Sequence, residues 1–144
     1  RPLADVPIAW MAPPGPFGPP GREISAAELT EHHVLTNPSP SHLHRTIHAW
    51  FAAAGVRPRR VSTCDTLTII ARLAAEGIGV AVLPTAMARI DPLARDLRPL
   101  AAHPPLAPHR LHAVHRRAAD SGAVAIAIAE ASALVAASPL YAPV

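Results

Sequence analysis

The sequence predicts an α/β fold with a doubly wound sheet, from its patterning and its composition. Short apolar runs alternate with stretches of helical period, which is the order of a sheet whose strands are joined by crossover helices. Half of the 144 residues are hydrophobic, yet only 3% are aromatic. A core made mainly of Leu, Ile, Val and Ala is typical of parallel strands covered by alanine-rich helices.

The first forty residues are expected to form a strand, a loop, a short helix and a second strand. The apolar run 8–12 suits a strand, whereas the Pro- and Gly-rich stretch 13–21 suits neither a helix nor a central strand and forms a stiff loop. Ser25 and Glu28 have capping-box spacing, which predicts the start of a short helix. A short buried strand over 34–36 ends this part at a Pro-rich turn.

The middle of the chain carries the clearest helical pattern. From residue 41 the apolar side chains share one helical face, and Gly55 follows as the C-terminal stop. A strand over 60–63 leads to a second helix, which Asp65 or Thr66 caps. The predicted buried face of that helix is Leu67, Ile70, Ala71 and Ala74, and Gly77 ends it. The β-branched run 78–83 is then a strand that Pro84 stops.

The last third continues the alternation. We expect a helix over 85–94, a short strand over 97–100, a further strand over 111–114 and a final helix over 123–137. Right-handed crossovers would place the helix N-termini along the carboxyl edge of the sheet, where open α/β sheets bind ligands.

Charge and cysteine usage narrow the classes of function. All thirteen basic residues are Arg, they are scattered, and the net charge is only +3, so the chain itself is not expected to bind DNA. Cys64 is the single cysteine, which excludes an internal disulfide and fits a reducing cytoplasm. No apolar run reaches membrane-span length, and no membrane partner is expected. The chain begins at Arg1, and we expect an N-terminal portion to be missing.

Two polar loops are the candidate ligand site. Each follows a predicted strand and precedes a helix, so each supplies hydroxyls and free N–H groups at a positive helix end. One contains Thr36, Asn37, Ser39 and Ser41, and the other contains Thr63, Cys64, Asp65 and Thr66. The alternative is that Ser41 and Asp65 or Thr66 only cap helices. Two such loops at one sheet edge favour a ligand cleft.

Other chemistry has less support. His44 and His48 are four apart on a predicted helix and His42 lies two before His44, but no carboxylate or Cys lies at motif spacing beside them, so no metal and no cofactor is predicted. Cys64 near a helix start could be a nucleophile, but no resolving Cys or marked base accompanies it, and a buried or pocket-lining thiol fits better. The chain has no nucleophile elbow, no phosphate-binding loop and no dinucleotide fingerprint. We therefore predict no catalytic residues and no enzyme.

Several segments resemble LysR-type transcription regulators of bacteria when taken in order. They are VSTCDTL at 61–67, AEGIGVAVLP at 75–84, WFAAAGV at 50–56 and LHAVHRR at 111–117. The resemblance covers about residues 6–136. It implies the effector-binding region of that family, which is a bilobal type II periplasmic-binding-protein-like domain with Rossmann-like subdomains.

The resemblance also implies an organisation and partners. Residues 1–111 would be the second effector-binding subdomain and 112–144 the return segment to the first, so the chain is a fragment that holds one wall of the cleft. It would bind a small-molecule effector through the two polar loops. DNA would be bound only through an N-terminal domain absent from this chain, and the full-length protein would form homo-oligomers.

Two features depart from common family members. One is the Pro-rich loop 13–21, and the other is Asp65, where a neutral polar residue is frequent. An acid at this place disfavours an anionic effector unless an Arg compensates. The alternative class with the same architecture is a solute-binding protein of a transporter.

Overall fold

The computed structural model describes residues 1–115 and 122–142, which divide into two compact units. The larger unit is Ile8–Leu106, and the smaller combines Arg1–Pro7 with Ala107–Val144. Each unit is described separately. The predicted division into 1–111 and 112–144 concerns the complete effector-binding region and stays a prediction.

A five-stranded sheet forms the centre of the larger unit, in the order β5-β4-β6-β2-β7. Its strands are β2 (Ile8–Ala12), β4 (His33–Thr36), β5 (Arg60–Thr63), β6 (Val80–Pro84) and β7 (Arg98–Pro99). β4 is parallel to both β5 and β6, whereas β2 is antiparallel to β6 and to β7. The α/β prediction is confirmed, with a parallel side (β5, β4 and β6) and an antiparallel side (β6, β2 and β7).

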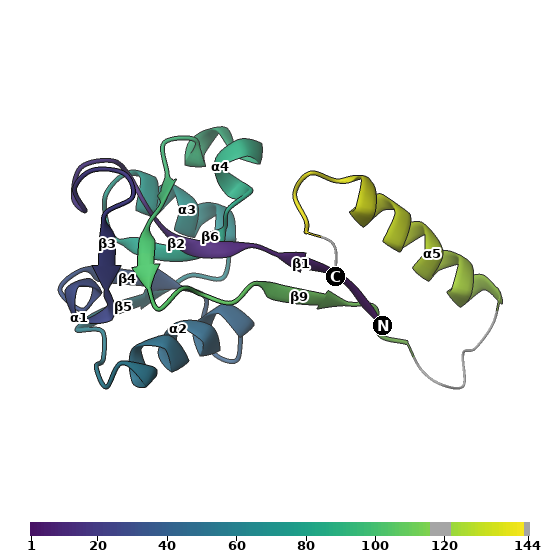
Figure 1. The fold of residues 1–144 in the computed structure, drawn as a ribbon, viewed down its shortest axis with the longest axis horizontal. Coiled ribbons are helices and arrows are strands. Elements are labelled where there is room, and N and C mark those ends of the chain that lie inside the picture. The colour runs from purple at the N-terminus through teal and green to yellow at the C-terminus, as the bar shows by residue number, and fades with distance from the viewer. Residues whose placement is uncertain (116–121, 143–144) are drawn as a thin grey trace. The chain divides into compact units, whose positions relative to one another are not determined.

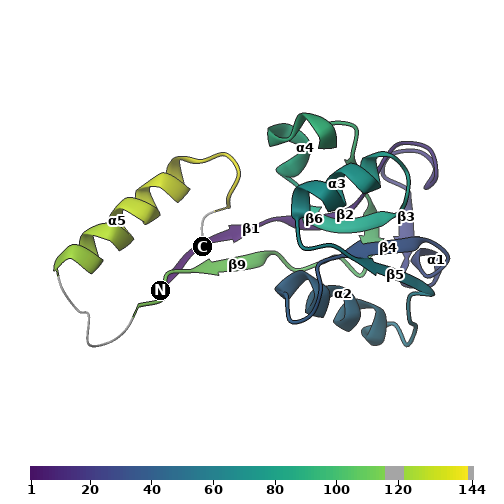
Figure 2. The same cartoon turned by 180° about the vertical axis from the view of Figure 1, so that it is seen from behind.

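The sheet is covered on both faces (Figures 1 and 2). The two main helices are α2 (His42–Ala53) and α3 (Leu67–Ala75). Side chains alternate between the two faces of a strand. Consecutive residues of β2 therefore pack on opposite faces of the sheet. Met11 packs in a buried cluster with Ile70 of α3, whereas Trp10 packs on Trp50 and Phe51 of α2, with ring centroids 5.3 and 5.6 Å apart. The helix-spacing prediction for α2 is confirmed.

The ends of these helices follow local rules. Ser41 caps α2, because its Oγ accepts a hydrogen bond from the His44 backbone N–H at 3.1 Å. Gly55 and Gly77 follow α2 and α3 with φ of 70° and 77°, the left-handed region that glycine occupies without strain. Gly79 lies so close to β4 that an added Cβ would overlap the His33 carbonyl oxygen.

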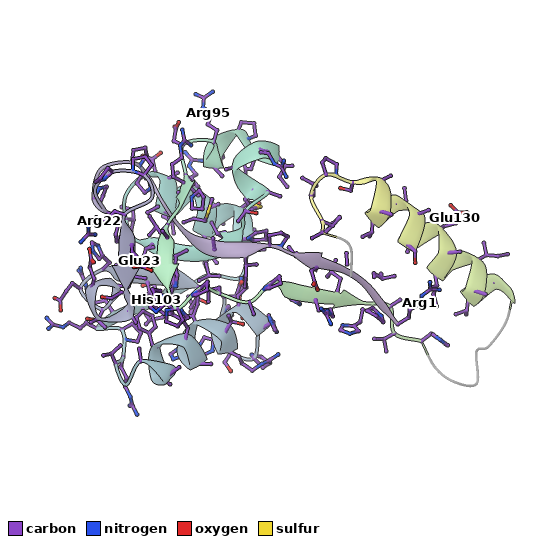
Figure 3. All side chains as sticks on the ribbon, viewed as in Figure 1. Arg1, Arg22, Glu23, Arg95, His103 and Glu130 are labelled. Carbon is purple, nitrogen blue, oxygen red and sulfur yellow. The ribbon has the colours of Figure 1, made fainter. Side chains whose placement is uncertain are left out.

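The Pro-rich loop leads into a second, smaller sheet. β3 (Glu23–Ser25) pairs in parallel with β8 (Ala101–His103), and Figure 3 labels Glu23 and His103, whose side chains lie 3.5 Å apart. Phe17 anchors the loop against His32, with ring centroids 4.3 Å apart. Ser25 accepts from the Glu28 N–H and starts α1 (Ala26–Leu29) as predicted, whereas the Glu28 carboxylate pairs with the Arg22 guanidinium.

Several predicted elements differ from the structure. The helix expected over 85–94 is split into α4 (Met87–Ile90) and the 3-10 helix η1 (Pro92–Ala94), because Pro92 lacks an N–H and starts a new turn. Ile78 is 53% exposed and precedes β6 rather than belonging to it. On α3, Ile70, Ala71 and Ala74 are buried, but Leu67 is only half-buried.

The smaller unit contains two antiparallel strands and one helix. β1 (Pro2–Val6) pairs with β9 (His109–His112), and the Asp5 carboxylate accepts two hydrogen bonds from the Arg110 guanidinium at 2.9 and 3.1 Å. That pairing lowers the pKa of Asp5. The helix α5 (Gly122–Ala137) matches the prediction over 123–137. Arg116 and Arg117 of the family-like segment lie outside the described residues.

Candidate ligand-binding site

The two predicted loops meet at one edge of the main sheet. β4 and β5 are neighbouring parallel strands in which Thr36 pairs with Thr63, so both strands end at the same place. The loop after β4 enters α2 and the loop after β5 enters α3, and these helices lie on opposite faces of the sheet. A crevice opens where neighbouring connections diverge in this way, and such crevices bind ligands in open α/β sheets.

Two hydrogen bonds fasten the loops to each other. The Cys64 backbone N–H donates to the Thr36 carbonyl oxygen at 2.9 Å, and the Asn37 side-chain amide donates to the Cys64 carbonyl oxygen at 3.0 Å. Asn37 therefore has a positioning role that its place in the sequence did not reveal. Its remaining side-chain oxygen is an acceptor.

The loops line a shallow hollow of about 360 Å³ that is open to solvent. Four of the eight predicted site residues line it, together with two prolines that sequence reasoning did not select. The lining residues are Asn37, Pro38, Ser39, Pro40, Ser41 and Asp65. Prolines offer no functional group to search for in a sequence, but their rings give this wall a fixed shape. Thr63, Cys64 and Thr66 belong to the second loop without lining the hollow.

Thr36 is the last residue of β4, directly before Asn37 of the lining, and has an unusual environment. Its side chain is 2% exposed, and its hydroxyl has no hydrogen-bond partner among the described residues. Buried hydroxyls are normally paired, and an unpaired one costs about 1–3 kcal/mol. Such a group at the end of a strand, next in sequence to a residue that lines the hollow, is an expected feature of a site that serves function rather than stability.

The two helix starts differ in how they are capped. Ser41 is committed to α2 through its bond to His44, so the capping alternative holds for this residue. Thr66 occupies the N-cap position of α3, but its side chain accepts no capping hydrogen bond. The first-turn N–H groups of α3 thus have no side-chain acceptor, which leaves a partial positive charge beside Asp65.

Cys64 and the histidines take structural positions. Cys64 is partly buried and packs against the core cluster around Met11 and Leu35. The rings of His44 and His48 stack on α2 with centroids 4.3 Å apart, and burial, with the charge of His44, lowers the pKa of His48. Within residues 1–115 and 122–142 no three His, Cys, Asp or Glu residues cluster as a metal site.

Other hollows also occur in the described part of the larger unit. One of about 580 Å³ lies between α2 and β5, and one of about 120 Å³ lies under the Pro-rich loop. No helix in the described part of the chain is long and apolar enough to cross a membrane.

A doubly wound sheet with a polar crevice at its switch point defines the class of α/β small-molecule-binding domains. The chain matches the family model described as LysR substrate binding domain over residues 1–135, and it therefore belongs to this family. Its fold is the type II periplasmic-binding-protein-like fold of LysR effector-binding domains. No curated protein matches the chain.

Solved structures show the same fold at low sequence identity. The regulatory domain of CcmR from Synechocystis PCC6803, in complex with 2-PG, has a TM-score of 0.75 and 17% identity. The regulatory domain of MetR, a LysR family regulator from N. meningitidis, has a TM-score of 0.74 and 17% sequence identity. The BenM effector binding domain with its effector benzoate has a TM-score of 0.63 and 15% sequence identity. The alignments cover 93%, 100% and 94% of this chain, but only 65%, 67% and 62% of theirs.

Proposed function

We propose that the chain is the effector-sensing part of a LysR-type transcription regulator and binds a small metabolite at the two loops after β4 and β5. The observation that carries this proposal is the hollow of about 360 Å³ at the switch point of the sheet, in a chain that belongs to the LysR substrate binding domain family. Four of the eight predicted site residues line this hollow, and the other four lie beside them in sequence at the ends of β4 and β5 and before α3. Family membership favours a regulator over a transporter's solute-binding protein.

The domain acts by binding and carries no catalysis of its own. A metabolite that bridges two subdomains and prefers one closure state shifts the population of that state. The shift then rearranges linked DNA-binding domains, which couples effector concentration to transcription. A cytoplasmic location follows from this role, as does homo-oligomer formation by the full-length regulator.

The smaller unit supports the assignment of 112–144 as a return segment to the first subdomain. Its helix α5 has one charged residue, Glu130 (labelled in Figure 3), and none of its side chains is buried. A helix that is apolar all round normally lies inside a core. Because the similar regulatory domains are about a half longer than this chain, we infer that α5 packs against the remainder of the first subdomain.

A metabolite screen with matched variants tests the proposal. Ligands that raise the melting temperature of the chain are retested on Ser39→Ala and Thr66→Ala, whose exposed hydroxyls make no hydrogen bond within the described residues. We expect both variants to fold normally and to bind the ligand about tenfold more weakly, since each loses about one hydrogen bond. Equal binding to the wild type and both variants would remove the site from these loops.

A further inference from the structure

Asp65 is the single charged side chain that lines the hollow between the two loops. Within residues 1–115 and 122–142 its carboxylate makes no hydrogen bond and no ion pair, although it lies next to the uncapped start of α3. The positive end of that helix stabilises a negative charge at its N-terminus. The chain therefore already supplies an anion where an effector's carboxylate would otherwise be stabilised.

Several of the other groups at the hollow are hydrogen-bond acceptors, and the Ser39 hydroxyl can donate or accept. Asn37 uses one N–H of its side-chain amide in the bond to the Cys64 carbonyl, and its side-chain oxygen is an acceptor. Pro38 and Pro40 have no N–H, and Ser41 accepts the capping bond of α2. The acceptors among these groups can pair with a ligand that donates hydrogen bonds.

No arginine forms an ion pair with Asp65 within residues 1–115 and 122–142. Arg45 donates to the Pro40 carbonyl oxygen and forms no ion pair among the described residues. No Arg or His lines the hollow itself. An anionic group placed here would face Asp65 with no basic side chain in the lining, whereas an ammonium group would form a charge-assisted hydrogen bond with Asp65.

We propose that the effector presents a protonated amine to Asp65, so that Asp65 selects amine-bearing metabolites over simple carboxylates. This proposal rests on the proposed function, because it names the chemical class of ligand for the same site. The net charge of +3 means that the whole chain attracts anions in preference to cations. A preference for an amine over a carboxylate must therefore come from the site itself.

Four probes with the same carbon backbone separate the ligand classes: putrescine, 4-aminobutanoate, 1,4-butanediol and succinate. Each is titrated into the ¹⁵N-labelled 144-residue chain, and shifts of the amides in 36–41 and 63–67 are followed, since shift mapping suits weak binding. We expect putrescine to bind at least about tenfold more tightly than succinate, the difference that one charge-assisted hydrogen bond supplies.

Variants assign the preference to one carboxylate. Asp65→Asn should weaken putrescine binding about tenfold and narrow the gap to succinate. The matched control is Asp96→Asn, which removes the same charge from an exposed position outside the hollow and should leave both affinities unchanged. Spectra of the free variants confirm that the fold is intact.

The outcomes separate this proposal from the function on which it rests. Tighter binding of succinate at these amides, or unchanged putrescine binding in Asp65→Asn, overturns the amine assignment and leaves the ligand site in place. If none of the four probes shifts these amides, the amine assignment is also overturned. The ligand site itself is then tested by the metabolite screen. A screened metabolite whose shifts lie entirely outside both loops overturns both.

Discussion

Replacing Thr36 with valine tests the unpaired hydroxyl at the end of β4. Valine has nearly the same shape as threonine, so Thr36→Val removes the hydroxyl without leaving a cavity. The side chain is 2% exposed and its hydroxyl has no partner among the described residues. Removing an unsatisfied buried hydroxyl should raise the free energy of unfolding by about 1–2 kcal/mol. For a unit of this size that corresponds to a rise in melting temperature of roughly 5 °C or more.

The assay is urea unfolding followed by tryptophan fluorescence. Trp10 and Trp50 both lie in the larger unit, so the signal reports on the unit that contains Thr36. Thr63→Val is the matched control, because Thr63 pairs with Thr36 across the strands but is exposed. This substitution should change the free energy of unfolding by no more than about 0.5 kcal/mol. A loss of 1 kcal/mol or more in Thr36→Val would show that the hydroxyl has a partner and refute the reasoning.

Two further predictions concern the packing around the site. Gly79→Ala should lower the free energy of unfolding by about 2–4 kcal/mol in urea titrations, because its Cβ would overlap the His33 carbonyl oxygen. The control is Gly122→Ala, where an added Cβ meets open space and should not destabilise the chain. Equal changes in the free energy of unfolding for the two variants would contradict this prediction. The lowered pKa of His48, caused by burial and by His44, means that the unfolded chain binds its proton more readily. The contribution of neutral His48 to stability is therefore fully present above the ordinary histidine pKa of about 6.5 and is lost as the pH falls through the pKa of His48 in the folded chain. His48→Gln should reduce the loss of unfolding free energy between pH 7 and 5, and an unchanged loss would remove His48 as its cause.

Local rules were enough to predict the elements that place the candidate site. The spacing of Leu43, Ile47 and Trp50 predicts α2, Ser41 caps it, and Gly55 ends it in the left-handed region as glycine does. The polar residues after two neighbouring strands then lie together, because parallel strands end at one edge. This part depends only on short-range pattern and on the handedness of crossovers.

Other features depend on contacts between distant parts of the chain. β1, β3 and β8 were not predicted, since each is short and is defined by a partner far away in sequence, such as the pairing of Ile24 with Ala102. The bond from the Asn37 amide to the Cys64 carbonyl and the unpaired hydroxyl of Thr36 arise only when β4 and β5 are side by side. A propensity or spacing rule contains no term for such pairings.

The most direct test of the account is to map where a metabolite from the screen binds. The ¹⁵N-labelled chain is titrated with that metabolite and the amides that shift are assigned. The account predicts that the largest shifts fall in 36–41 and 63–67 and that Ser39→Ala reduces the affinity about tenfold. Shifts concentrated instead around the hollow between α2 and β5, with normal binding to Ser39→Ala, would contradict the central claim.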